Sequence, residues 1–252
     1  MIIDTHCHLD QLPHRSFISE HCPANSYITM GTSISNWDNV IQLSVDHCNI
    51  SPALGLHPWF VNENYESEVQ LLKTMIDQYK IPVIGEIGLD FSSKYISTKD
   101  LQLQAFEQQL SFAEQFNLPV SLHVYKAHNE VIQLLKRYSV KGAVHGFGSS
   151  IQIAIQYLEL GFKLGVNGIL VRDNAHRYHS IVRTFGLNAL LLETDAPNII
   201  LPNREVASLI DIYTIVIKIA ELTGLPESEV IRLTNQNAQS IFNLRNEIEP
   251  II

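Results

Sequence analysis

Short apolar runs alternate with longer stretches of helical periodicity along nearly the whole chain. Apolar runs bounded by turn residues are typical of buried strands, and apolar positions three or four residues apart are typical of amphipathic helices. The sequence predicts eight strands, at Ile2–His8, Ser26–Thr32, Ser51–His57, Pro82–Leu89, Pro119–Val124, Lys141–Phe147, Phe162–Val166 and Ala189–Thr194. It predicts helices at Ser35–Cys48, Glu66–Tyr79, Thr98–Asn117, His128–Tyr138, Ser150–Leu160, Ala175–Phe185, Arg204–Thr223 and Glu227–Asn246.

Eight strand–helix units in one chain predict a (β/α)8 TIM barrel of the α/β class. The alternation by itself also allows a doubly wound open sheet, because it does not show closure. The 252 residues match the length of one such barrel, and no linker, charge block or low-complexity segment divides them. We therefore expect residues 1–252 to form a single domain. The first unit is irregular, because Pro13 and Pro23 limit any helix between the first two strands to two or three turns.

Composition and charge limit the cellular location and the partners that we expect for the protein. The sequence has no apolar run long enough to span a membrane and no secretory signal, and its three cysteines lack C-x-x-C spacing. We therefore expect a cytoplasmic protein with reduced thiols and no membrane partner. The net charge of −9 argues against an extended nucleic-acid footprint, although bound divalent cations would still attract a phosphate substrate. No oligomeric state follows from the sequence.

Histidines and carboxylates stand at the predicted strand ends, where the catalytic groups of a TIM barrel gather. Strand alternation places Asp4, His6 and His8 on one face of the first strand and Cys7 on the other. Later strands end with His57, Glu86, His123, His145 and Asp195. A lone histidine at such a position is more often a hydrogen-bonded structural residue than a ligand. Six imidazoles and carboxylates together, His6, His8, Glu86, His123, His145 and Asp195, instead suit two metal ions, with Glu86 the central candidate for a bridge.

Other histidines and cysteines do not form a comparable pattern. His176 and His179 are three residues apart on a predicted helix, where a solvated face is the simpler expectation. The pairs His21-Cys22 and His47-Cys48 lack the second half of a metal motif, and we expect them to be incidental. Cys7 is expected to pack between the barrel and a helix.

The ordered motifs of the chain resemble those of the TatD family of metal-dependent hydrolases, within the amidohydrolase-like barrels. The resemblance rests on Asp4-Thr5-His6-Cys7-His8, Gly55-Leu56-His57-Pro58, Gly85-Glu86-Ile87-Gly88-Leu89-Asp90, Leu118-Pro119-Val120 with His123, His145-Gly146-Phe147, Glu193-Thr194-Asp195-Ala196-Pro197 and Thr234-Asn235-Gln236-Asn237. It implies that His6 and His8 bind one divalent cation, that His123 and His145 bind a second, and that Glu86 bridges them. It also implies that Asp195 holds the first cation and orients or deprotonates the attacking water.

Members of this family are often labelled deoxyribonucleases that use magnesium, manganese or zinc. The resemblance therefore implies a two-metal hydrolase of phosphoester bonds, with DNA ends and 3'–5' exonuclease action among the expectations. His57 and Lys126 are our own candidates for substrate contacts. One departure bears on substrate: the family usually follows its strand-five histidine with Ser-Arg, where this chain has Val124-Tyr125-Lys126. That departure and the acidic balance keep a second hypothesis open, an amide, lactone or ester hydrolase of small molecules. A barrel that binds metal or ligand without catalysis is the third.

Overall fold

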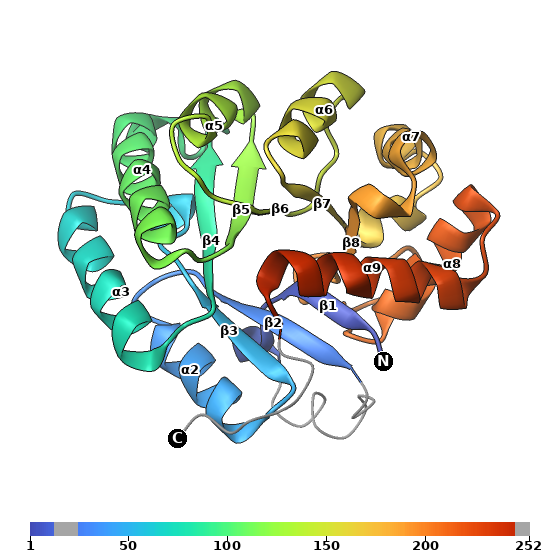
Figure 1. Ribbon diagram of the computed structural model, residues 1–252, viewed down its shortest axis with the longest axis horizontal. Coiled ribbons are helices and arrows are strands. Elements are labelled where there is room, and N and C mark those ends of the chain that lie inside the picture. Colours follow the sequence, from blue (N-terminus) through green and yellow to red (C-terminus); the bar gives the residue numbers. More distant parts are fainter. Residues whose placement is uncertain (13–24, 245–252) are drawn as a thin grey trace.

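The computed structural model describes residues 1–12 and 25–244 and contains one eight-stranded parallel sheet (Figure 1). The strands are β1 (Ile3–Cys7), β2 (Ser26–Gly31), β3 (Ile50–Leu54), β4 (Val83–Asp90), β5 (Val120–Tyr125), β6 (Gly142–Val144), β7 (Lys163–Val166) and β8 (Leu190–Leu192). Each strand pairs in parallel with the next one along the chain, from β1 to β8. A doubly wound sheet would instead reverse its strand order at a switch point, so the barrel prediction is confirmed.

Eight α-helices accompany the strands in the described part of the chain. They are α2 (Trp37–Asp46), α3 (Tyr65–Tyr79), α4 (Lys99–Phe116), α5 (His128–Leu135), α6 (Ile151–Glu159), α7 (His176–Phe185), α8 (Asp211–Thr223) and α9 (Glu227–Phe242). Single 3-10 turns lie at η1 (Leu9–Gln11), η2 (Pro58–Phe60), η3 (Ile96–Thr98), η4 (Gly168–Val171) and η5 (Leu187–Ala189). The helices from α2 to α8 surround the strands in Figure 1. No helix among the described residues is long and apolar enough to cross a membrane.

The first and last strands are joined just beyond the end of β8. Asp195 donates its backbone N–H to the carbonyl of His6 at 2.9 Å, and His8 donates to the carbonyl of Ala196 at 2.8 Å. The Thr5 hydroxyl adds a bond of 3.0 Å to the carbonyl of Leu192. These bonds bring the ends of β1 and β8 together, so the residues that follow both strands meet at one end of the barrel.

Helix α9 covers the opposite, amino-terminal end of the barrel, where it crosses the strands in Figure 1. Its residues Ala238, Ile241 and Phe242 pack in one apolar cluster with strand residues that include Ile3 and Leu191. The larger apolar cluster lies between the strands and the outer helices. The carboxyl end of the barrel, away from α9, is the end at which the predicted ligands stand in or shortly after their strands.

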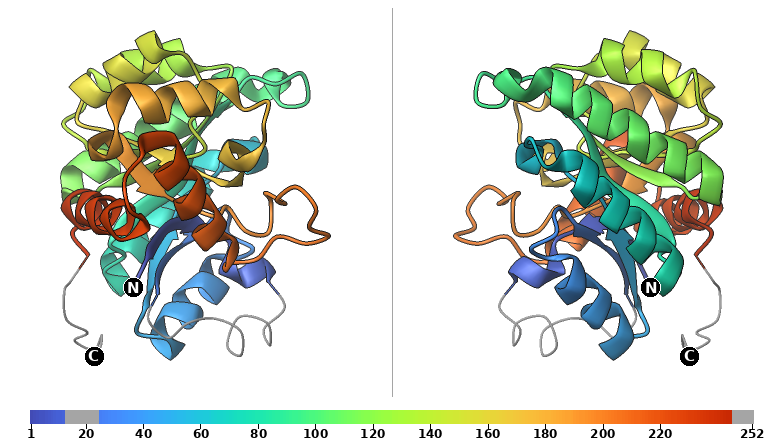
Figure 2. Two further views of the ribbon diagram at one scale, coloured as in Figure 1. Left: turned by 90° about the vertical axis from the view of Figure 1, so that its right-hand side faces the viewer. Right: turned by 90° about the vertical axis from the view of Figure 1, so that its left-hand side faces the viewer.

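The segment between β8 and α8 differs from its prediction. We expect a helix from Arg204, but α8 begins at Asp211, and residues 197–210 project from the barrel in Figure 2. Asp211 Oδ2 accepts the N–H of Ser208 at 2.9 Å, while the Asp211 N–H bonds back to the Ser208 carbonyl at 3.1 Å. The bond from the Ser208 N–H to the Asp211 carboxylate is one half of a capping box, and it helps to set the start of the helix.

Two sequence predictions fall partly outside the described residues. The short helix limited by Pro13 and Pro23, together with the His21-Cys22 pair, lies in the undescribed segment 13–24. The last two residues of the helix predicted over Glu227–Asn246 also lie outside, and α9 ends at Phe242, before Asn243 adopts a left-handed φ of 50°.

Candidate metal centre

The six predicted ligands lie together at the carboxyl end of the barrel. They come from β1 or directly after it (His6, His8), from β4 (Glu86), from β5 (His123), from the residue after β6 (His145) and from the segment after β8 (Asp195). Four of these side chains are buried, and His123 and His145 are half-buried. Burying so many ionisable groups costs free energy unless they neutralise one another or bind a cation.

Glu86 lies at the centre of this cluster, and its two carboxylate oxygens face different histidines. Oε2 is 3.4 Å from His6 Nε2 and 3.7 Å from His8 Nε2. Oε1 is 3.1 Å from His123 Nδ1 and 3.6 Å from His145 Nε2. This division is the one expected of a carboxylate between two cation positions.

The register of β4 against β5 brings Glu86 and His123 together. Gly88 pairs with His123 across the two strands and has a φ of +145°, which L side chains rarely adopt. A Cβ at Gly88 would lie 1.9 Å from the His123 carbonyl oxygen. Glycine is therefore required here for the close approach of the two strands that carry these ligands.

Asp195 extends the cluster on the side of His8. Its Oδ1 lies 3.4 Å from His8 Nε2 and accepts a hydrogen bond of 3.0 Å from Asn198 Nδ2. The backbone of Asp195 has a φ of 53°, a left-handed conformation that is uncommon for residues other than glycine. Such backbone conformations are concentrated at functional sites, where the surrounding structure fixes them.

The ring of His6 is oriented as a metal ligand would be. Its Nδ1 lies 3.1 Å from the Ser121 hydroxyl, so a proton on Nδ1 leaves the lone pair of Nε2 directed toward Glu86. His6 Nε2 and His8 Nδ1 are buried and have no hydrogen-bond partner among the described residues. Ligand atoms close enough to hold an ion occur in His6–His8–Glu86, in His57–Glu86–His123 and in His6–His145–Glu193. The donor set therefore fits divalent cations.

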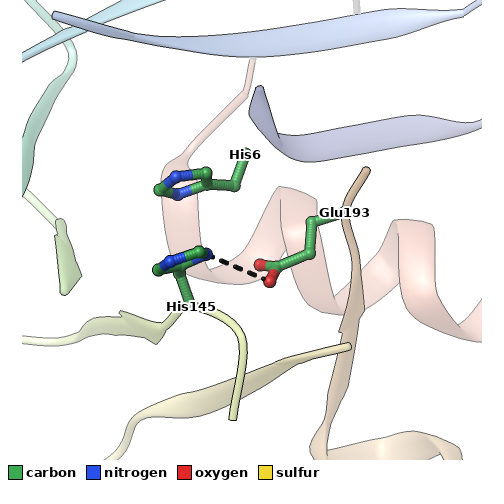
Figure 3. Close-up of side chains that lie close together, drawn as sticks. All are labelled: His6, His145 and Glu193. Atoms are coloured by element: carbon green, nitrogen blue, oxygen red, sulfur yellow. Dashed lines mark ion pairs between the residues drawn. The ribbon is translucent and has the colours of Figure 1, made fainter. Parts of the chain in front are cut away.

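Glu193 belongs to the site, although it was not among the predicted ligands. Figure 3 shows His6 and His145 face to face, with the Glu193 carboxylate beside the second ring; the ring centroids are 3.9 Å apart. Glu193 Oε1 lies 3.3 Å from His145 Nδ1 and also accepts the N–H of Gly146. A Cβ at Gly165 would lie 2.1 Å from the Glu193 carboxylate, so β7 leaves space for this side chain. The carboxylate holds the His145 ring, as outer partners of metal-binding histidines do.

Asp90 is a second residue of the site that was not among the predicted ligands. Its Oδ2 lies 3.2 Å from His123 Nε2 and accepts a hydrogen bond of 2.7 Å from Trp59 Nε1. Its Oδ1 accepts the N–H of Ser92 at 2.8 Å. Asp90 therefore fixes the His123 ring from the side opposite Glu86 and links it to an indole on the rim.

The charges of the cluster keep its carboxylates ionised. Burial opposes ionisation of Glu86, but the neighbouring His57, His6 and His145 hold its carboxyl pKa well below the usual range. Burial also opposes ionisation of Asp195, and His145 again outweighs it, bringing the pKa to about 2. Both carboxylates are thus ionised at neutral pH.

The pKa values of two histidines in the cluster, His145 and His57, shift in opposite directions. Burial alone would lower the pKa of His145, but the carboxylates of Asp195 and Glu86 raise it to about 10. At His57 burial dominates, and the pKa falls to about 4. Ligating imidazoles must be neutral, so cation binding to this cluster would displace protons.

Asp4 connects the ends of β1 and β8 behind the ligands. Its carboxylate accepts hydrogen bonds from the Thr194 N–H at 3.1 Å, the Thr194 hydroxyl at 2.6 Å and the His6 N–H at 3.2 Å. Burial raises the Asp4 pKa to about 7 despite these bonds. The pairing of β1 with β2 shifts register between Asp4 and Cys7, so the simple alternation predicted for this strand is interrupted there.

The two predicted substrate contacts lie at different depths. His57 is buried, with Nε2 at 3.4 Å from Glu86 Oε1, so it lies among the candidate ligands rather than on the rim. Lys126 is exposed beyond β5, with its Nζ 5.5 Å from the centre of the Tyr125 ring. A substrate contact by either residue stays a prediction.

Other histidines and cysteines among the described residues have different surroundings. His176 is exposed as predicted, but the prediction for His179 is wrong, because its ring is buried and its Nε2 lies 2.8 Å from the Leu170 carbonyl oxygen. Cys7 packs in an apolar cluster that includes Leu43 of α2, which confirms its predicted role between barrel and helix. Cys48 is exposed.

Comparison with known proteins agrees with the fold and identifies the family. The sequence profile of the family described as TatD related DNase matches residues 3–243. The chain is 30% identical to the metal-dependent hydrolase YjjV of Escherichia coli (strain K12), over 96% of this chain and 98% of that protein. It is 31% identical to a metal-dependent hydrolase of Haemophilus influenzae, over 95% of this chain and 98% of that protein.

A solved structure resembles this one along almost its whole length. The crystal structure of YjjV, described as a TatD homolog, superposes with a TM-score of 0.89 at 28% identity and covers 97% of this chain and 98% of its own. Fold, family profile and relatives therefore agree, and the chain belongs to the TatD family of metal-dependent hydrolases.

Proposed function

We propose that this protein hydrolyses phosphoester bonds with two divalent cations, zinc, manganese or magnesium, and that the ends of DNA strands are among its substrates. One observation carries the proposal: Glu86 directs Oε2 toward His6 and His8 and Oε1 toward His123 and His145. One carboxylate between two imidazole pairs suits two cations that share a ligand. The family description as TatD related DNase supports the phosphoester class.

The chain offers a separate set of side chains for each cation. His6, His8 and Asp195 would hold the first, and His123 and His145 the second, with Glu86 shared. When bound, the cations supply an acidified water and a positive field for the charge that develops on a phosphoryl oxygen.

Asp195 is the proposed base. Its carboxylate is ionised at neutral pH and Asn198 holds its Oδ1, so it can accept the proton of an attacking water while its position stays fixed. Glu193 holds the His145 ring through Nδ1, and Ser121 holds the His6 ring through its own Nδ1. These contacts orient the imidazoles before substrate arrives, which reduces the reorganisation that the reaction requires.

A second candidate is hydrolysis of a small-molecule amide, lactone or ester at the same centre. Tyr125 favours it, because this residue is 49% exposed where the family usually carries an arginine that suits a phosphate. The net charge of −9 favours it as well. A barrel that binds without catalysis is the weakest candidate, since all six candidate ligands are present.

Elemental analysis of the purified protein, combined with a substrate panel, tests the proposal. The panel contains single-stranded oligonucleotides, simple phosphodiesters and phosphomonoesters, lactones and amides, each assayed with wild type, Glu86→Gln and Asp195→Asn. We expect about two cations per chain and hydrolysis of phosphoesters that both variants lose. Hydrolysis of lactones or amides alone would overturn the phosphoester assignment and establish the second candidate.

A further inference from the structure

Two aromatic rings from different loops stack at the carboxyl end of the barrel. Trp59 lies in η2 after β3, and Tyr95 lies in the loop between β4 and α4. Their ring centroids are 5.3 Å apart and their planes differ by 15°. Trp59 is nevertheless 47% exposed. An indole that is stacked on one neighbour and still open to solvent has surface left for another planar ring.

This stacked pair touches the candidate metal centre. The Trp59 indole donates its N–H to Asp90 Oδ2 at 2.7 Å, and the same oxygen lies 3.2 Å from His123 Nε2. The indole also meets the His57 and His123 rings edge to face, with centroids at 4.9 and 5.8 Å. A group bound on the pair would therefore be a direct neighbour of the ligands.

Cationic side chains accompany the rings, although the chain as a whole is acidic with a net charge of −9. Lys94 Nζ lies 4.9 Å from the centre of the Tyr95 ring. Across the β4–β5 pair, Tyr125 is in register with Asp90, and Lys126 Nζ lies over the Tyr125 ring. Aromatic faces combined with ammonium groups are the features by which proteins hold single-stranded nucleic acid: rings stack on the bases, and cations meet the phosphates.

We propose that Trp59 and Tyr95 form a stacking subsite for a nucleobase of the substrate, with Lys94 and Lys126 placed to meet its phosphates. This inference rests on the proposed phosphoester function and narrows it to substrates that carry a base next to the scissile bond. Stacking accepts any base, because each has a planar π-face, so the subsite does not select a sequence.

The test is equilibrium binding of three probes to the metal-loaded protein: thymidine 5'-monophosphate, deoxyribose 5-phosphate and inorganic phosphate. Calorimetry gives the affinities, and tryptophan fluorescence locates the base. The chain has two tryptophans, and Trp37 is fully buried with its indole N–H bonded to the Gly55 carbonyl. Quenching by the nucleotide therefore reports on Trp59.

We expect the nucleotide to bind about ten-fold more tightly than deoxyribose 5-phosphate, the usual gain from stacking one base. Trp59→Ala and Tyr95→Ala should each reduce the ratio of these two affinities to near one, whereas Tyr95→Phe should keep the ratio of wild type. Tyr95→Ala is the sharper variant, because the Trp59 indole also holds Asp90. Tyr79→Ala, which removes an exposed tyrosine at the end of α3, is the matched control and should bind like wild type.

The outcomes separate this subsite from the proposed function. Equal affinity for the nucleotide and the sugar phosphate, or a base preference that survives both alanine variants, would overturn the subsite even if phosphodiesters are hydrolysed. A base preference lost in both alanine variants supports the subsite even if no phosphodiester is cleaved, a result that would overturn the phosphoester function alone.

Discussion

Glu193 Oε1 lies 3.3 Å from Nδ1 of His145, and Nε2 of the same imidazole lies 3.6 Å from Glu86 Oε1. His145 is thus held between a carboxylate behind it and a carboxylate in the centre of the cluster. A buried carboxylate at Nδ1 fixes the ring and increases the basicity of Nε2. We infer that Glu193 is a positioning residue for His145.

Glu193→Gln should lower cation affinity or kcat/KM by about 10- to 100-fold, because glutamine keeps the shape and loses the charge. Gly165→Ala should produce a similar loss, since its Cβ would lie 2.1 Å from the Glu193 carboxylate. Titration of cation binding and steady-state kinetics measure both. Glu159→Gln, at an exposed position on α6, is the control. Lower thermal stability with unchanged cation affinity and kcat would mean that Glu193 has a structural role only.

Asp195→Asn should abolish turnover and leave the fold intact. The amide cannot accept a proton from water, and the loss of a general base typically costs 10²- to 10⁴-fold in rate. Asparagine is nearly isosteric and can still bond to Asn198, so circular dichroism and the melting temperature should stay close to those of wild type. Asp173→Asn, at an exposed position before α7, is the matched control. Full activity in Asp195→Asn would remove Asp195 from the mechanism.

Divalent cations should stabilise the protein in proportion to the logarithm of their concentration. A ligand at one hundred times its Kd stabilises the folded state by about 2.7 kcal/mol, which corresponds to roughly 5–10 °C in Tm for a chain of this size. Thermal melts after chelation and re-addition of zinc, manganese or magnesium measure the effect. Glu86→Gln should reduce the shift strongly and Glu159→Gln should not. Equal shifts in both variants would place the cations elsewhere.

The fold and the ligand cluster could be predicted because the sequence places polar residues where a barrel strand needs none for packing. His6, Glu86 and His123 each interrupt or end an apolar run, and parallel strands bring such positions to one edge. The missed residues also stand in motifs that carry predicted ligands. Glu193 is two positions before Asp195, and Asp90 is four positions after Glu86.

Other features depend on packing between distant segments and have no local pattern. Trp59 reaches Asp90 only because η2 turns back over the end of β4, and the start of α8 depends on the bonds between Ser208 and Asp211. His179 looks like a surface residue in its helix, and its burial follows from η4 folding over it. The burial of His57 beside Glu86 could likewise not be predicted, because spacing along the chain does not give the distance between the two side chains.

The asparagines of Thr234-Asn235-Gln236-Asn237 have a structural role at the amino-terminal end of the barrel. Asn237 Nδ2 donates to the carbonyls of Leu187 and Leu190 at 2.7 and 2.8 Å and thereby ties α9 to β8. Asn237→Ala should lower the free energy of unfolding by about 1–3 kcal/mol, because two carbonyls lose their donor. Urea unfolding measures this, with exposed Gln236→Ala as control. A loss of kcat in Asn237→Ala at temperatures where it is fully folded would contradict a purely structural role.

His128 should make the fold sensitive to mild acid. Its Nδ1 lies 3.1 Å from the Tyr157 hydroxyl, and burial lowers the ring pKa to about 4 from the usual 6.5. Between pH 6.5 and pH 4 the unfolded chain binds a proton that the folded chain does not, so the free energy of unfolding falls as the pH is lowered through this window. Above pH 6.5 both states are neutral and the effect vanishes. Urea unfolding at pH 7.5 and pH 5 should therefore show a loss that is about 1–2 kcal/mol smaller in His128→Gln than in wild type or in the exposed control His176→Gln. Equal losses in all three proteins would mean that His128 titrates alike in the folded and unfolded states.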